Sequence, residues 1–132
     1  SDNITTPVRA EGNAGYFWIG KNQYQIYEGT IHYLENGSDS YTIISGTVRV
    51  QATIVELTGE GNVADSISTF AQPQAGSVLE DGTRFTVINR NTYNITINDG
   101  TGNIQTKGGV NIVLAQNEAA TFVCDGGIYY QS

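Results

Sequence analysis

The choice of apolar side chains is the feature that most constrains this fold. The chain contains 14 Ile, 10 Val and 15 Thr residues against 4 Leu and no Met. Side chains that branch at Cβ lose rotamer freedom in helices and pack well on pleated sheets. Glycine occurs 16 times, and Asn-Gly or Asp-Gly dipeptides, which favour tight turns, begin at residues 36, 81, 99 and 125. We therefore predict an all-β fold, either an antiparallel β-sandwich or a jelly-roll-like barrel of short strands, with little or no helix.

Alternation of apolar residues marks the expected strands. In the first half it is clearest at Val48, Val50, Ala52 and Ile54, which we expect on one face of a strand. Residues 62–72 fit a strand, an irregular loop or a short helix, and their poor helix formers favour the first two. The second half has the more regular pattern, and the strands predicted there are 83–89, 92–98, 110–114, 119–124 and 128–130.

The length of 132 residues suits one domain with a core of its own. We expect a polar N-terminal arm at 1–13 and a single β domain at 14–132. The segment 71–77 has the composition of a linker, which leaves open a subdivision near it. The first residues lack the basic and apolar regions of a signal peptide. The single cysteine, Cys124, excludes an intrachain disulfide, and we expect it to be a small buried hydrophobe in a chain made in a reducing cytoplasm.

The charge pattern argues against two classes of partner. The net charge is −7, from 13 acidic and 6 basic residues, and the basic residues are scattered singly along the chain. Binding to nucleic acid requires clustered Lys and Arg that neutralise phosphates, so we expect no nucleic-acid partner. No apolar run approaches the roughly 20 residues of a membrane-spanning helix, and we expect no membrane partner either.

The residues that could carry catalysis or bind metal do not form a recognisable pattern. His32 is the only histidine, and a zinc site needs several His or Cys ligands. Glu56 and Glu60 are close in sequence, as are Glu80 and Asp81, but glycosidases oppose two carboxyl groups across a cleft. The oxygen-rich segment 99–103 lacks the spaced acids of a calcium loop, and a plain hairpin is the simpler interpretation. We predict no catalytic residue, no metal, no cofactor and no enzyme activity.

Aromatic residues are concentrated near the N-terminus of the predicted domain. Six of them fall within residues 16–33, and alternation assigns about half, such as Phe17, to a core. Core packing alone could explain the whole group. Alternatively, the others form an exposed surface for a partner protein or for stacking on a glycan. The candidate residues of this contact surface are Tyr16, Trp18, Tyr24, Tyr27 and Tyr33.

The C-terminal part has a pattern of strands and turns that is similar to a known family. Its segments are LEDGTRFTVIN at 79–89, ITI at 95–97, LAQNEAATFVCDG at 114–126 and Tyr129-Tyr130. Over residues 77–132 this order resembles the C-terminal ends of fibre, spike and capsid-decoration proteins of tailed bacteriophages. A Trp-Tyr pair often closes the family's pattern, and Tyr129-Tyr130 occupies that place here. In physical terms, Phe122 fills a core and the turn at 125–126 brings Tyr129 back across it.

The resemblance implies a structural role in a virion. It favours a homotrimeric capsid decoration (cement) protein or head-fibre protein, on the capsid exterior, that binds the lattice of the major capsid protein or another virion protein. The single cysteine and the missing signal peptide agree with production in the host cytoplasm, and in this role we expect the polar arm at 1–13 to reach a neighbouring capsid subunit. The alternative is the receptor-binding tip of a tail fibre or a lectin-like carbohydrate-binding module, whose partner would be a glycan of the host surface.

Overall fold

The computed structural model of the chain describes residues 14–19, 22–27, 30–72 and 79–132. The expected arm at 1–13 lies outside these residues, as does most of the segment 71–77 where a subdivision was considered. Within the described part the fold is all-β, as predicted. Its only helical elements are two short 3-10 turns, η2 (Glu60–Asn62) and η3 (Lys107–Gly109).

The strands follow one another through the described residues, and most fall close to the stretches that the sequence predicts. Their bounds are β1 (Ala14–Ile19), β2 (Asn22–Tyr27), β3 (Thr30–Thr42), β4 (Thr47–Arg49), β5 (Ala52–Thr58), β6 (Asp65–Ile67), β7 (Thr69–Ala71), β8 (Arg84–Asn89), β9 (Ile95–Ile97), β10 (Ile104–Gln105), β11 (Ile112–Leu114), β12 (Glu118–Asp125) and β13 (Ile128–Gln131). The tight turn expected at Asn36-Gly37 is wrong, because both residues lie inside the long strand β3, where its register against β5 shifts.

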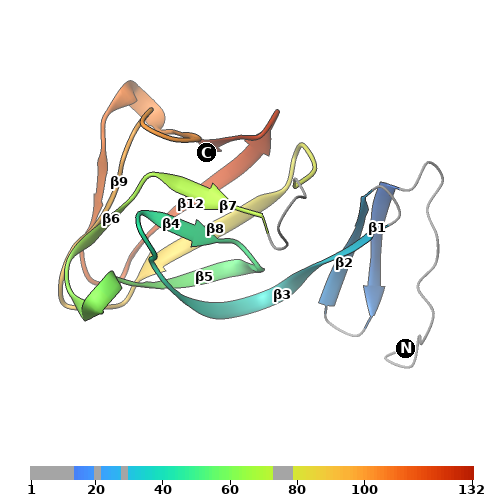
Figure 1. The fold of residues 1–132 in the computed structure, drawn as a ribbon, viewed down its shortest axis with the longest axis horizontal. Helices are drawn as coiled ribbons and strands as arrows, with labels where there is room; N and C mark the ends of the chain where they lie inside the picture. Colours follow the sequence, from blue (N-terminus) through green and yellow to red (C-terminus); the bar gives the residue numbers. More distant parts are fainter. Residues whose placement is uncertain (1–13, 20–21, 28–29, 73–78) are drawn as a thin grey trace.

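These strands build a β-sandwich from one large and two small sheets. The large sheet has the order β1-β2-β3-β5-β8-β12-β13-β10, and the small sheets have the orders β11-β9-β6 and β4-β7. Figure 1 shows β4 and β7 over the body of the large sheet and β6 and β9 at one end of it. The β1–β2 hairpin lies at the opposite end and is joined to the body through the long strand β3. The predicted sandwich is therefore confirmed.

The expectation that its strands pair only in antiparallel fashion is wrong. The pairs β3–β5, β5–β8, β4–β7, β6–β9 and β10–β13 are parallel, whereas the remaining pairs are antiparallel. The physical reason is the course of the chain. After β5 the chain crosses to the small sheets through η2 instead of turning back, and it returns to the large sheet only at β8. We call this passage a circuit. Because of it, β8 runs parallel to β5, with Val87 opposite Val55, and β9 runs parallel to β6, with Ile97 opposite Ile67.

A cluster of aromatic rings fills the centre of the sandwich. Phe70, Phe85, Phe122 and Tyr129 are each at most 1% exposed, and five pairs of their rings have centroids 5.0–5.9 Å apart. Burial of one such ring stabilises a fold by roughly 1.5–3 kcal/mol, and each edge or stacked contact adds about 0.5–1.5 kcal/mol. The hairpin β12–β13 brings Tyr129 opposite Cys124 and onto Phe122's side of the sheet, as the sequence predicts.

Two details of the predicted alternation are wrong. Val48, Val50 and Ala52 are buried, but the inward position then passes to Val55 instead of Ile54. At this point the register between β3 and β5 shifts, and the Thr53 hydroxyl hydrogen-bonds to the backbone N–H and carbonyl of Gly37 on β3. Val110 is 65% exposed because the strand that it was assigned to begins only at Ile112.

Candidate functional site

The five aromatic residues of the predicted contact surface lie on three neighbouring strands. The register places Tyr24 opposite both Phe17 and Tyr33. Since residues that pair across strands share a face of the sheet, Tyr24 and Tyr33 belong to one set of positions. The alternate set contains Tyr16, Trp18 and Tyr27, which pair with Gln25, Gln23 and Ala14. The structure thus divides the five residues between two faces, and their role in binding stays a prediction. His32 is opposite Gln25 in the same sheet.

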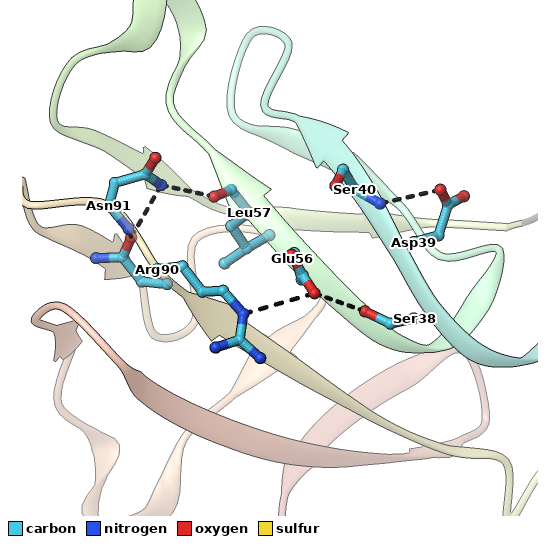
Figure 2. Close-up of polar contacts among 8 residues, drawn as sticks. Ser38, Asp39, Ser40, Glu56, Leu57, Arg90 and Asn91 are labelled. Carbon is cyan, nitrogen blue, oxygen red and sulfur yellow. Dashed lines mark hydrogen bonds and ion pairs between the residues drawn. The ribbon is translucent and has the colours of Figure 1, made fainter.

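A polar cluster ties three strands together on the outer face of the large sheet. Glu56 Oε2 accepts a hydrogen bond from Ser38 Oγ at 2.8 Å and lies 3.5 Å from Arg90 Nε. Figure 2 shows Ser38 and Arg90 reaching Glu56 from opposite sides. The Arg90 side chain is 58% exposed, and an exposed ion pair contributes at most about 1 kcal/mol. The cluster therefore works as a modest brace between β3, β5 and the end of β8.

An asparagine network fixes the corner at the end of β8. Asn89 is fully buried and donates hydrogen bonds from Nδ2 to the carbonyl oxygens of Tyr93, at 2.7 Å, and Leu114, at 2.8 Å. Its Oδ1 accepts from the backbone N–H of Asn91, and Asn91 Nδ2 donates to the carbonyl of Leu57 (Figure 2). Buried polar groups are costly unless they are bonded in this way. The network joins both layers of the sandwich.

The other carboxylates considered for catalysis hold turns. Glu60 Oε1 accepts a hydrogen bond from the backbone N–H of Ser45, and Asp81 Oδ1 accepts one from the N–H of Gly126. The predicted turn at Glu80 is confirmed, because its carbonyl accepts from the N–H three residues later. These carboxylates bond to backbone donors of separate loops, which is what bracing a sandwich requires.

The segment after β9 is a braced loop and not the predicted plain hairpin. β9 pairs with β11, and β10 pairs with β13 instead of turning back on β9. Asp99 Oδ1 accepts from the backbone N–H and the hydroxyl of Thr106, while Asp99 N donates to Asn111 Oδ1. Across the described ranges no group of three or more His, Cys, Asp or Glu could hold a metal ion.

The lone cysteine lies in the core, as predicted. Cys124 is 1% exposed, and burial raises the pKa of its thiol. A thiol whose pKa is raised forms little of the reactive thiolate at neutral pH. Burial also raises the pKa of the neighbouring Tyr129 to about 12. The Tyr129 hydroxyl accepts a hydrogen bond from Gln72, whose other amide atom accepts from the N–H of Leu79, so the side of the sandwich near 72 and 79 is held to the core.

Comparison with known proteins assigns the fold to a family. Residues 51–130, more than half of the chain, match the model of the phage depolymerase C-terminal beta sandwich domain. The chain belongs to this family. The match to the phage depolymerase C-terminal β-sandwich begins at about the start of β5, well before the part in which the sequence resembles phage fibre proteins. Membership supports the phage assignment and the sandwich, and it leaves a capsid-decoration or head-fibre role as a proposal.

Other comparisons add the fold alone. No curated protein matches the sequence. The phage β-sandwich is similar to a chain in a solved "Structure of a chaperone-substrate complex", with a TM-score of 0.50 and 15% identity. That alignment covers 83% of this chain and 19% of the other, so this chain spans about a fifth of that protein. Among the described residues, no helix is long and apolar enough to cross a membrane.

Sequence reasoning missed one feature of the domain. It gave no role to Asn89, although Asn89 continues the inward series of Phe85 and Val87. Of the two adjacent tyrosines, Tyr129, which the sequence predicts to lie across the core, is buried, whereas Tyr130 is 42% exposed.

Proposed function

We propose that this phage β-sandwich is a non-enzymatic structural module of a virion. The observation that carries the proposal is the family match over residues 51–130. The family's name refers to depolymerases, which are enzymes, and to a domain at their C-terminal end. In this chain the carboxylates of Glu60, Asp81 and Asp99 each accept hydrogen bonds that brace loops, which supports a structural role for the domain.

Two locations on the virion suit such a module. The family's name favours a tail spike or tail fibre. The resemblance in the C-terminal sequence also includes capsid-decoration and head-fibre proteins, whose partner is the major capsid protein. The aromatic residues of the β1–β2–β3 sheet are the proposed contact with that partner, and replacement of Trp18 by alanine tests them.

The expected homotrimer would cover apolar side chains that one copy leaves open. Val113 is 54% exposed on β11, which is an edge strand, and Val110 just before it is 65% exposed. Edge strands with exposed apolar residues are surfaces at which copies of a chain associate. We place the contact between copies there.

The deciding experiment locates the chain on purified virions of the phage that carries its gene. Antibodies against the sandwich, seen by immunogold electron microscopy, should label the tail at a few sites or the head surface at many. Tail labelling supports the spike or fibre location, and head labelling supports decoration. Virions without any label, with the protein absent by mass spectrometry, would refute the virion role. Release of sugars from host polysaccharide by the purified chain would refute the non-enzymatic role.

A further inference from the structure

The strand β3 has an open edge along its second half. Residues 30–34 of β3 pair with β2, whereas residues 35–42 pair with β5 on the opposite side of β3. Among the described residues, therefore, no strand pairs with the β2 side of β3 from Ser38 to Thr42. Figure 1 shows β3 running from the β1–β2 hairpin into the body of the sandwich. Along this stretch the large sheet ends in an edge that is about 17 Å long.

Backbone groups of β3 are directed to the open side of this edge. The Ile43 N–H donates to the carbonyl of Thr58 at 2.8 Å, and successive N–H groups of a strand point to opposite sides. The N–H groups of Ser40 and Thr42 therefore point away from β5. The Ser40 N–H donates to Asp39 Oδ1 at 2.9 Å, as Figure 2 shows. An extended strand laid along this edge would supply backbone acceptors for that side of β3.

Asp39 limits which strand can be added to the edge. It pairs with the buried Val55, and two residues later Tyr41 pairs with the buried Leu57, so Asp39 lies on the core side of the sheet. Asp39 is nevertheless exposed, because it lies at the open edge. A charge that points inward on an edge strand opposes strand addition, since the new strand would cover it and remove its water.

A strand that brings its own cation avoids this cost. In the described part of the chain, Asp39 has no ion pair, whereas Glu56 on the outer face is paired with Arg90. A Lys or Arg opposite Asp39, on the core side of the added strand, would complete a pair beside the new backbone bonds. A second copy of β3 offers no cation between Ser38 and Thr42, and the net charge of −7 further opposes that pairing. The edge therefore favours a basic strand of a different protein.

We propose that the edge of β3 from Ser38 to Thr42 binds an extended segment of a partner protein that carries Lys or Arg opposite Asp39. Backbone hydrogen bonds attach the segment, and Asp39 selects it by charge. The edge is short, so one copy binds weakly, with a Kd on the order of 1 mM. Several copies on one particle raise the avidity. The inference goes beyond the structural role proposed above and applies at either location on the virion.

An NMR titration of the isotope-labelled full chain with two peptides tests the edge. The probes are TVTKTVT and TVTETVT, blocked at both ends, in which the valines and the central charge share one face of an extended strand. TVTKTVT should shift the backbone amides from Ser38 to Thr42 and saturate. TVTETVT should bind at least about tenfold more weakly, because its glutamate faces Asp39.

Charge reversal at Asp39 tests the selection directly. In Asp39→Lys the order of the two peptides should reverse, and in Asp39→Asn their Kd values should differ by no more than about threefold. Asp125→Lys is the matched control, because Asp125 is an exposed aspartate on β12 and its replacement changes the net charge equally. It should leave the preference for TVTKTVT in place. Thermal melting verifies that the variants stay folded.

Three results would overturn the proposal. The first is the absence of any shift from Ser38 to Thr42 with TVTKTVT, or shifts that are confined to another edge. The second is equal affinity of the unaltered chain for the two peptides. The third is a preference for TVTKTVT that persists in Asp39→Lys, since the selecting charge would then lie elsewhere.

Discussion

Asn89 gives the most direct test of how the sandwich is held together. Its replacement by alanine would leave the carbonyl oxygens of Tyr93 and Leu114 without their donor, and the N–H of Asn91 without its acceptor. A buried polar group that loses its partner costs about 1–3 kcal/mol. Two carbonyls and one N–H that relax in part suggest a loss of about 3–4 kcal/mol, a large fraction of a typical domain's free energy of unfolding.

Urea unfolding of the purified chain measures this free energy. Asn89→Ala should lower the midpoint while leaving the slope unchanged, since the slope follows the surface exposed on unfolding. Asn91→Ala removes the side-chain bond to Leu57 and should cost about 1 kcal/mol. Asn94→Ala is the matched control. Asn94 is exposed, and its replacement should change the free energy by no more than about 0.5 kcal/mol.

Asn89→Asp separates hydrogen bonding from size. A buried aspartate facing two carbonyl oxygens has its folded-state pKa raised above the unfolded value, because burial and the carbonyls both disfavour the charge. The stability of this variant should therefore be greater below pH 4 and should fall as pH rises through the folded pKa, relative to the wild type at each pH. If Asn89→Ala costs no more than Asn94→Ala, or if Asn89→Asp matches the wild type at pH 7, the network does not hold the corner.

Three further changes test other parts of the structure. The folded-state pKa of Tyr129 is raised to about 12, so its contribution to the free energy of unfolding is fully present below the unfolded pKa near 10 and is lost as pH rises from 10 to 12. In urea titrations at these pH values, Tyr129→Phe should flatten this fall. Gly102→Ala would place a methyl group against the carbonyl of Ser68 and should lower Tm by several degrees, a result that an unchanged melting curve would contradict. Val113→Asp should convert the expected homotrimer to a monomer by light scattering, whereas Val63→Asp, at an equally exposed valine, should not.

The sequence predicted the elements of this fold better than their arrangement. β-branched residues and Gly-containing turns are local signals, and they located β8, β12 and β13 to within a residue or so. Phe122 and Tyr129 were recognised as core because alternation and a tight turn between them fix their faces.

The pairing of distant strands could not be predicted in the same way. The strand beside β5 in the large sheet could be β6, which comes next in sequence, or β8, which is the one observed. The choice depends on where the chain goes after Gly59, and no residue pattern encodes that path. The tyrosines of the candidate contact surface were grouped by nearness in sequence, whereas the register divides them by alternation. Asn89 escaped notice because an asparagine near a turn usually marks the turn itself.

The parallel circuits have a consequence for the order in which the domain folds. β8 lies between β5, which precedes it by a whole circuit, and β12, which follows it by another stretch of chain. Pairs so far apart in sequence require large loops to close first, which slows folding. Since Phe122 and Tyr129 complete the aromatic centre, Phe70 and Phe85 cannot reach their final packing until residues 118–131 have left the ribosome. A nascent chain stopped before β12 would expose Phe70 and Phe85 to solvent, and such chains are prone to aggregate.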